Sequence, residues 1–445
     1  LPELKDDFSS LARACTECGA QPVTLSRCGK CRLVHYCSRA CQLAGWNRGG
    51  HKRTCGQPLP TPESVRGSSP TQLQRTVAEF GCASAQVATA CMMRVCTTHP
   101  ASTDGQRYAK AFGTAAGVQS IERVMAHFPA LPGVQLTALP ALMLVGERRG
   151  AAVLLGGDAV ALTAKALAQD FPATPSGYPA REFVSTNALL FLKNLYMEQN
   201  EAQAAVIKRA LVAAGGVPAV CRALHDFPKN VRLRDFGLTV LMMTVANDYT
   251  AKEQAVAAGA AALCVTALRN DLRRLERPQE ELPTRRAPES HALESSGRDL
   301  LGSVHAACCA LRNLTVGEDA KGVARKRAAV VTGGVYFVCG ALCSQAVIED
   351  EENVEAALSA LLNMFCDETA SSIDRLLPHG IEGLLRMGVL PALNAHPKCE
   401  QVQMFGVSAL NTYTLFAGEA VKERLCRGAI AASALAALVR MIYHH

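Results

Sequence analysis

The chain has 445 residues, of which 49% are hydrophobic, so it can bury a large core and is not a disordered polymer. Its longest apolar runs, such as 255–267, are shorter than the roughly 18 to 20 residues that cross a bilayer, and we expect no membrane-spanning helix. The net charge of +7 is small for this length and no block of like charges occurs, which disfavours a nucleic-acid partner.

The N-terminal residues lack a basic segment followed by an apolar one, so no secretory signal is predicted. Twelve of the 19 cysteines are scattered through aliphatic segments, and two of these, Cys308 and Cys309, are adjacent. Free thiols of this kind behave as small buried hydrophobic groups inside a reducing cell. We therefore expect a cytoplasmic or nuclear protein.

The other seven cysteines and one histidine gather near the N-terminus, within residues 1–57. Their spacing is Cx2C, x9, Cx2C, x5, Cx3C, x9, Hx3C, and it comprises Cys15, Cys18, Cys28, Cys31, Cys37, Cys41, His51 and Cys55. A Cx2C pair directs both sulfurs to one point, whereas Cx3C and Hx3C place two ligands one helical turn apart. Eight ligands therefore predict two tetrahedral zinc ions as cofactors, although spacing alone leaves their pairing open. His35 is a spare candidate that we expect on the surface.

This segment is too short to bury a sufficient core, so bound metal is expected to stabilise its fold. No ligand position is left open for a substrate, which favours structural over catalytic zinc. The positive charge of the segment is largely cancelled by seven thiolates, even after two zinc ions are added. A protein partner is therefore favoured over a nucleic acid.

Residues 15–55 resemble the MYND zinc finger in this spacing and in four further features. These are YC at Tyr36 and Cys37, CQ at Cys41 and Gln42, Trp46, and HK at His51 and Lys52. A RING finger differs, because its last two pairs are Cx2C. The resemblance implies interleaved sites. One zinc would be bound by Cys15, Cys18, Cys37 and Cys41, and the other by Cys28, Cys31, His51 and Cys55.

MYND fingers bind short proline-containing peptides, and the resemblance assigns peptide binding to Gln42 and Trp46. An indole packs well on a proline ring, and the amide of a glutamine can pair with a peptide backbone. Trp46 has an alternative role, which is to pack its helix on the zinc core. The interval between Trp46 and His51 is longer than is usual in this family.

Residues 58–73 are rich in Pro and Ser and predict a linker. A motif such as ALRNL then recurs along residues 74–445. The next-to-last residues of its copies are Arg94, Leu144, Asn194, Thr244, Asn313, Asn363 and Thr412, and the intervals between them are 50, 50, 50, 69, 50 and 49 residues. A fixed period indicates a solenoid of about seven repeats plus a partial C-terminal one.

The long interval of 69 residues requires an insert, and the charged, Pro-containing residues 272–300 are expected to form it as a surface loop. Glycines between apolar segments predict helix ends, which gives three helices in each repeat. These glycines are Gly117, Gly215, Gly216, Gly259, Gly333, Gly334, Gly380 and Gly428.

This arrangement resembles armadillo repeats, with a somewhat longer period. The resemblance implies a mainly α fold, a right-handed α-solenoid of three-helix repeats that follows the small two-zinc finger. It also implies peptide binding by Asn194, Asn313 and Asn363, because an Asn amide can donate to and accept from one peptide unit. A structural role, bonding the next loop, is the alternative for each.

No phosphate-binding loop, nucleophile elbow or catalytic cluster is visible, so no catalytic residue is predicted and an enzyme is not expected. His127, His225 and His396 each precede a Pro-terminated turn, which indicates repeat architecture. We expect a scaffold or adaptor in transcriptional regulation or complex assembly. The alternatives are a MYND-associated lysine methyltransferase, which requires a β-rich SET fold, and a ubiquitin-ligase adaptor, for which RING spacing is absent.

The last apolar segment, residues 429–441, is hydrophobic nearly all round. We expect it to form a helix that is covered by another chain or by further sequence of the same protein, because exposed faces of this kind mark interfaces. Self-association through this C-terminal helix is therefore predicted.

Overall fold

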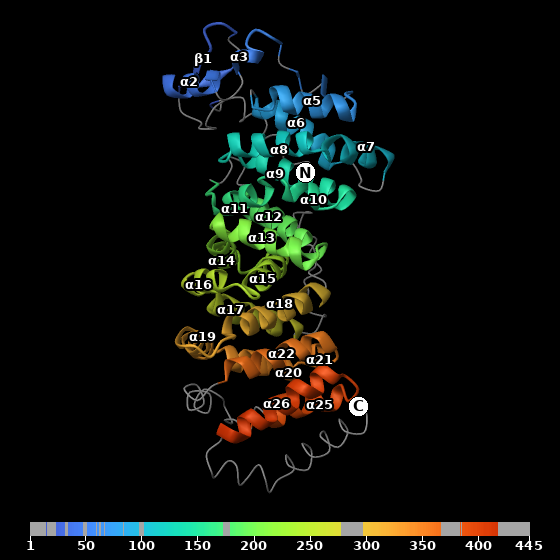
Figure 1. Ribbon diagram of the computed structural model, residues 1–445, viewed down its shortest axis with the longest axis vertical. Helices are drawn as coiled ribbons and strands as arrows, with labels where there is room; N and C mark the ends of the chain where they lie inside the picture. The colour runs from blue at the N-terminus through green and yellow to red at the C-terminus, as the bar shows by residue number, and fades with distance from the viewer. Residues whose placement is uncertain are drawn as a thin grey trace, which may run out of the picture. The chain divides into compact units, whose positions relative to one another are not determined.

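The structure is a computed structural model of a mainly helical chain (Figure 1). It describes residues 15, 24–31, 34–47, 51–58, 60–61, 64–65, 67–82, 84–97, 102–171, 179–276, 297–365, 383 and 385–416. Its contacts divide the chain into two compact units, Leu1–Ala223 and Leu224–His445. The predicted C-terminal helix at 429–441, together with Gly380 and Gly428, lies outside the described residues.

The first unit contains the small finger and a series of helices. The finger has strands β1 (Ser26–Arg27) and β2 (His35–Tyr36), which pair antiparallel, and helices α2 (Arg39–Asn47) and α3 (His51–Thr54). The helices that follow are α5 (Pro70–Phe80), α6 (Ala85–Cys96), α7 (Thr103–Phe112), α8 (Ala115–His127), α9 (Pro132–Arg149), α10 (Ala152–Leu155), α11 (Ala159–Ala168), α12 (Ala180–Met197), α13 (Glu201–Ala213) and α14 (Gly216–Asp226), the last of which extends past the end of the unit.

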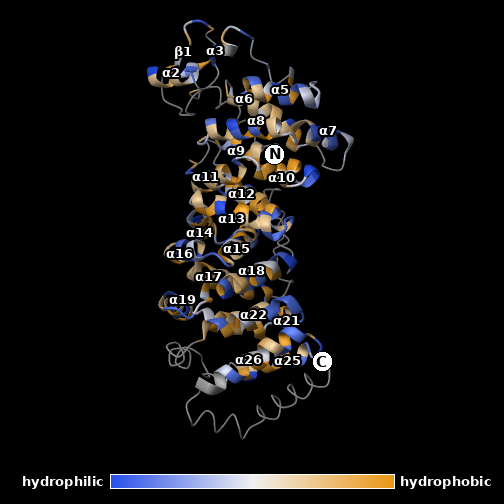
Figure 2. Cartoon of the chain, in the orientation of Figure 1, coloured by the Kyte–Doolittle hydropathy of each residue, from blue (hydrophilic) through white to orange (hydrophobic). Residues whose placement is uncertain are grey.

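The second unit is also helical. Its elements are α15 (Val231–Val245), α16 (Tyr249–Ala257), α17 (Ala260–Leu275), α18 (Gly297–Thr315), α19 (Ala320–Val331), α20 (Gly334–Cys343), α21 (Gln345–Ile348), α22 (Glu351–Met364), the π-helix η3 (Leu385–Val389), α25 (Leu390–Ala395) and α26 (Glu400–Phe416). Figure 2 shows both hydrophobic and hydrophilic residues on most helices, as expected where one face is buried and another meets water.

Within each unit, one class of helix packs in chain order. In the first unit α6 packs on α9 and α9 on α12, and in the second α15 packs on α18, α18 on α22, and α22 on α26. Each of the seven recurring positions found in the sequence lies on one of these helices. The aliphatic residues of the repeated motif therefore form the contacts between successive helices of the series.

Glycines bend the chain between the other helices. Gly259 and Gly333 have φ angles of 75° and 92°, a left-handed conformation that glycine adopts without strain. The helices on either side of them meet at 70° and 61°, and α13 and α14 meet at 77° around Gly215. Gly117 was predicted to have the same role, but it lies inside α8, where its missing side chain permits a close approach to the backbone of Phe112.

Two predicted boundaries are wrong. The linker at 58–73 ends earlier, because α5 begins at Pro70 with a capping box between Ser69 and Gln72. Pro is favoured at the first position of a helix, so the SSPTQ stretch is a helix start and not a loop. The insert at 272–300 is also shorter, because residues 272–275 continue α17 and residues 297–300 begin α18.

Buried polar side chains tie the start of a stacked helix to the end of the helix before it. Gln135 on α9 donates to the carbonyl oxygens of Met125 and Phe128, at 3.2 and 3.0 Å. Gln403 on α26 repeats this arrangement with Leu393 and His396, at 2.8 and 2.9 Å. The last carbonyls of a helix lack their usual partners within it, and these amides donate hydrogen bonds to the carbonyl oxygens at and just after such helix ends.

Arg234 on α15 has a similar position, but it also forms a buried ion pair. Its guanidinium donates to the carbonyl oxygen of Pro228 at 2.5 Å and to the carboxylate of Asp271 on α17. Ser303 on α18 donates to the second oxygen of Asp271 at 2.6 Å. The relative exposure of Arg234 is 2% and that of Asp271 is 0%, so this buried network joins three helices by direct hydrogen bonds.

Within the described ranges, no single helix is long and apolar enough to cross a membrane. Three bent pairs, α13 with α14, α16 with α17 and α19 with α20, reach the required length and composition only when both helices are taken together.

The buried ion pair generates a prediction about stability. Changing Arg234 to Met leaves the charge of Asp271 buried and without its cation, which costs about 3–5 kcal/mol of unfolding free energy. Arg232→Met is the matched control, because Arg232 is exposed on the same helix and should change stability by less than about 0.5 kcal/mol. Denaturant unfolding followed by circular dichroism measures both. Equal stability of the two variants would contradict the role of the pair.

Candidate metal centre

The finger is organised by a short hairpin and one helix. In the hairpin Ser26 pairs with Tyr36 and Arg27 with His35, and the N–H of Cys28 donates to the carbonyl oxygen of Val34 at 3.0 Å. This pairing holds Cys28 at the end of β1. The turn at residues 29–31, which follows β1, is preceded by Cys28 and ends in Cys31.

Helix α2 carries the Cx3C pair. The Ser38 hydroxyl accepts a hydrogen bond from the N–H of Cys41 at 3.2 Å and so caps the first turn of the helix. Cys37 precedes this turn and Cys41 lies on it, and their sulfurs are 3.5 Å apart. Tetrahedral zinc with bonds of about 2.3 Å separates two sulfurs by about 3.8 Å, so the pair has the spacing of two ligands of one ion.

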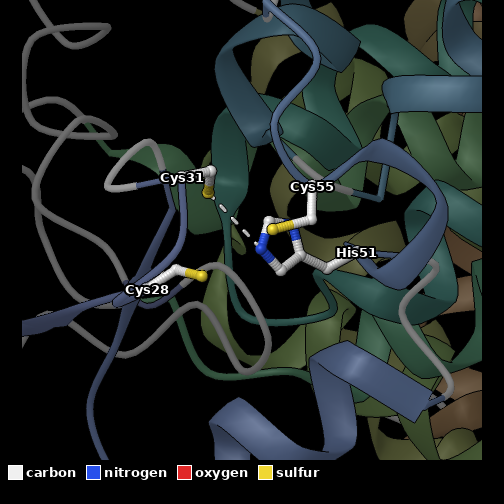
Figure 3. Close-up of side chains that lie close together, drawn as sticks. All are labelled: Cys28, Cys31, His51 and Cys55. Carbon is white, nitrogen blue, oxygen red and sulfur yellow. Dashed lines mark hydrogen bonds between the residues drawn. The ribbon is translucent and has the colours of Figure 1, made fainter.

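Two groups of side chains could each hold a metal ion. The first is Cys28, Cys31, His51 and Cys55, and the second contains Cys15, Cys37 and Cys41. In each group the ligand atoms lie within 4.8 Å of one another. Figure 3 shows the first group, whose side chains come from the hairpin turn and from the segment around α3 and point toward a common centre.

These groups agree with the interleaved pairing that the MYND resemblance implies. The segments that contribute to one group alternate along the chain with those that contribute to the other. Seven of the eight predicted ligands are thus brought together in two sets. The eighth, Cys18, lies outside the described residues.

The chemistry of the first group fits a zinc ion. Nε2 of His51 lies 3.5 Å from Sγ of Cys31, close to the roughly 3.6 Å that separates a nitrogen and a sulfur ligand of tetrahedral zinc. Nδ1 of His51 is buried and makes no hydrogen bond, and the residue is only 4% exposed. The Nε2 atom of this buried imidazole, beside a cysteine sulfur, is therefore the candidate nitrogen ligand of a zinc ion.

In the absence of a cation, two thiols of this group, Cys28 and Cys55, have widely different pKa values. Burial raises the pKa of the Cys28 thiol, but the N–H groups of Cys31 and Lys30 and the ring of His51 outweigh it and lower that pKa to about 6. Burial and the neighbouring sulfurs of Cys28 and Cys31 raise the pKa of Cys55 to about 11. A divalent cation would remove this conflict, because it stabilises every thiolate that binds it.

The core of the finger consists mainly of the ligands themselves. Cys15, Cys28, Val34 and Tyr36 are buried together, and Leu25 and the remaining described cysteines of the finger pack around them. Only three of the residues in this cluster are not metal ligands. The finger therefore has little hydrophobic core of its own, as expected for a fold that metal stabilises.

Trp46 lies on α2 and contacts a predicted ligand. Its ring meets the ring of His51 edge to face, with centroids 5.8 Å apart and planes at 72°, and Tyr36 meets the same imidazole at 6.2 Å. Trp46 is half-buried, so it packs on the metal centre with part of its surface and leaves part accessible. The packing role considered from the sequence is therefore present in the structure.

Gln42, the other predicted peptide-binding residue of the finger, is half-buried on α2, one turn before Trp46. Between them Leu43 is 54% exposed, an unusual position for a large hydrophobic side chain. Leu43 is not among the residues predicted from the sequence. Its place in the chain directly after Gln42 could have suggested it as a peptide-binding residue.

His35 belongs to neither metal group among the described residues. It lies on β2 and is half-buried, where burial and the charge of Arg27 lower its pKa. The sequence predicts His35 on the surface, whereas its side chain is half-buried in the structure.

The three predicted asparagines do not have the same surroundings. Nδ2 of Asn313 donates to the carbonyl oxygen of Met242 on α15 at 3.1 Å, and Nδ2 of Asn363 donates to that of Arg312 on α18 at 3.3 Å. Each of these amides thus joins its helix to the preceding helix of the stacked series. The side chain of Asn194 makes no such bond and is half-buried on α12.

The three histidines before turns are also separate in the structure. His127 packs on the neighbouring ring of Phe128, His225 contacts Asp226 at 3.0 Å, and Nε2 of His396 lies 2.6 Å from the carbonyl oxygen of Ile348. Each interacts with its own part of the chain, so the structure does not bring them together.

The two metal groups generate a prediction about stoichiometry. Native mass spectrometry of the full chain should show two zinc ions, because each group provides the ligands of one ion. Cys37→Ser should remove at least one ion and unfold the finger, while the helical circular dichroism of the remaining chain persists. Cys82→Ser, a change of a cysteine outside both groups, is the control and should retain two ions. A wild-type chain with one zinc ion would contradict the arrangement.

The asparagines generate a second prediction. Asn313→Ala and Asn363→Ala should each lower the free energy of unfolding by about 1 kcal/mol, because each removes a hydrogen bond to a carbonyl oxygen of the neighbouring helix. Asn194→Ala removes no such bond and should change stability by less than about 0.5 kcal/mol. Thermal or denaturant unfolding compares the three. If Asn194→Ala lowers the free energy of unfolding as much as Asn313→Ala does, the hydrogen bonds to the neighbouring helix are not the source of the stabilisation.

Comparison with known proteins supports the finger. Residues 15–55 match the family model of the MYND finger. The SET domain and MYND-type zinc finger protein 6 of Schizosaccharomyces pombe is 41% identical over 49 residues, which are 11% of this chain and 10% of that protein. The alignment thus spans about a tenth of the relative's length.

Among solved structures, the crystal structure of an engineered protein from the Northeast Structural Genomics Consortium is similar at a TM-score of 0.34 and 16% identity. It covers 86% of this chain and 94% of its own. The family match and the two groups of ligands coincide in residues 15–55, and this segment is a MYND zinc finger.

Proposed function

We propose that this protein is a scaffold in which the MYND finger binds a proline-containing peptide segment and the helical body binds a larger protein. The observation that carries the proposal is the face of α2, where Gln42, Leu43 and Trp46 combine an amide, an exposed aliphatic side chain and a half-buried indole. Such a surface suits an extended apolar peptide, which offers proline rings to the indole and backbone groups to the amide.

The metal centre would fix this face in place. Trp46 packs on His51, so binding of zinc by His51 holds the indole, and the helix cap at Ser38 places Gln42 and Leu43 on the first turns of the same helix. A preorganised surface binds a flexible peptide at a smaller entropic cost. Peptide binding should therefore depend on metal.

For the body we infer a right-handed α-solenoid of armadillo-like three-helix repeats. The inference is supported by the ordered packing of α15, α18, α22 and α26 in the second unit and by the glycine bends that precede the stacked helices. An array of this kind presents one long surface to a partner. Since Asn313 and Asn363 already bind the neighbouring helix, Asn194 is the asparagine whose amide is available to a ligand.

The cellular setting is part of the same proposal. Sixteen cysteines are free within the described residues, and most of those outside the finger are buried. This favours a reducing compartment, the cytoplasm or the nucleus. Transcriptional regulation and complex assembly are processes that use a scaffold of this type.

A lysine methyltransferase is the second candidate, since the similar protein of Schizosaccharomyces pombe carries a SET domain by its name. The short alignment does not extend that activity to this chain. A ubiquitin-ligase adaptor has no specific support beyond the combination of a finger with helices.

Peptide binding tests the proposal directly. The full, zinc-loaded chain is titrated into a fluorescent proline-rich peptide, and fluorescence anisotropy measures the dissociation constant. Leu43→Ser and Gln42→Ala should each weaken binding about tenfold. The first variant loses an apolar contact with the peptide, and the second loses a hydrogen bond to its backbone. Trp46→Ala should abolish binding.

Because Trp46 contacts His51, its variant is judged together with its zinc content. Leu43 is exposed and its variant should keep both ions, so a loss of binding there reports on the peptide surface alone. Gln74→Ala, an amide change on α5 outside the finger, is the control and should leave binding unchanged. Full binding by both Leu43→Ser and Gln42→Ala would contradict the proposed surface.

A further inference from the structure

A pocket separate from the finger lies between α8 and α11 in the first unit. Its volume is about 550 Å³, within the range of small-ligand sites. Its walls are formed by one face of each helix and by the turn between α10 and α11. The lining residues are Gln119, Glu122, Arg123 and Ala126 on α8, Gly156, Gly157 and Asp158 in the turn, and Ala161, Leu162 and Lys165 on α11. Of the lining residues, Ala126, Ala161, Gly156 and Gly157 have little or no side chain to fill this space.

Glu122 is the buried polar group of this pocket. The residue is 6% exposed, its Oε1 atom accepts no hydrogen bond, and no cationic side chain of the described chain forms an ion pair with it. Burial raises the pKa of its carboxyl group, and the charge of Asp158 acts in the same direction, whereas the N–H groups of Ala159 and Asp158 lower it. A buried carboxylate without a cation is costly unless a donor reaches it.

The turn beside Glu122 is shaped around this carboxylate. Gly157 lies so close to the Glu122 oxygens that a Cβ atom at this position would collide with them. The glycine therefore lets the acid approach the first N–H groups of α11, which attract negative charge. Those N–H groups account for one side of the carboxylate and leave Oε1 without a donor.

The rim of the pocket has unpaired charge of the opposite sign. Lys165 is exposed and forms no ion pair with any described residue, and within the same ranges Arg123 makes one side-chain hydrogen bond, from Nε to the carbonyl oxygen of Gln119 on its own helix, at 3.3 Å. An ammonium ion alone would meet these two cations on its way to Glu122. A ligand that carries both signs of charge would complement the whole pocket.

We propose that this pocket binds a zwitterionic group, with an ammonium facing Glu122 and a carboxylate facing Arg123 and Lys165. Two sources have this chemistry, a free α-amino acid and neighbouring Lys and Glu side chains of a peptide. The ammonium gives the buried carboxylate its missing donor, and the carboxylate neutralises the rim. The site is independent of the zinc finger and of peptide binding there.

Isothermal titration calorimetry of the full zinc-loaded chain at low ionic strength tests the proposal. The probes are free L-glutamate, N-acetyl-lysyl-glutamate amide, and N-acetylglutamate, which lacks the ammonium. We expect one of the first two probes to bind, and which one binds identifies the source. N-acetylglutamate should bind at least about tenfold more weakly, because a charge-assisted hydrogen bond is lost.

Two variants and two controls locate the site. Glu122→Gln and Lys165→Gln should each weaken binding of the effective probe by about tenfold or more. Glu147→Gln on α9 and Lys110→Gln on α7 change exposed charges of the same unit and should leave it unchanged. Lys165 is exposed, so its variant remains informative even if Glu122→Gln lowers stability.

Three results would overturn the proposal. They are no binding of either ammonium-containing probe, equal binding of N-acetylglutamate, and binding that Lys165→Gln leaves unchanged. The first result would indicate that Glu122 serves only to stabilise the start of α11.

Discussion

Repulsion among thiolates that lie close together is the constraint on which the finger depends. Cys28, Cys31 and Cys55 lie close to His51, and in the absence of a cation burial and the neighbouring sulfurs raise the pKa of Cys55 to about 11, whereas hydrogen bonds outweigh burial and lower that of Cys28 to about 6. A zinc ion turns this repulsion into attraction, and structural zinc contributes roughly 10–16 kcal/mol in small fingers. Since Val34, Tyr36 and Leu25 are nearly all of the remaining core, the metal also sets the position of α2.

The position of α2 links the metal to the surface that we propose for peptide binding. Trp46 contacts His51 with the edge of one ring against the face of the other, so the same side chain supports the centre and borders the exposed Leu43. A loss of metal and a loss of the indole should therefore have overlapping effects. Leu43 and Gln42 separate the two, because neither belongs to a metal group.

The helical body solves a different problem, the unpaired carbonyls at helix ends. Gln135 and Gln403 donate to carbonyl oxygens at the end of a preceding helix, Arg234 donates to that of Pro228 just after one, and Asn313 and Asn363 donate to carbonyl oxygens of the adjacent stacked helix. Buried hydrogen bonds of this kind are directional, whereas aliphatic contacts are not. They fix the register in which aliphatic helices, otherwise able to slide, pack on one another.

The spacing of cysteines and of the repeated motif by itself determined that a two-site finger precedes a body of stacked helices, because ligands one turn apart and aliphatic residues at a fixed period are local properties. The sequence also contains the signals of a helix start at Ser69, Pro70 and Gln72, although the Pro- and Ser-rich composition around them predicts a linker. Only the tertiary structure decided the rest. Trp46 on His51, Asn313 on Met242 and Glu122 beneath Gly157 are contacts between elements, and their partners are set by how helices pack and not by distance along the chain.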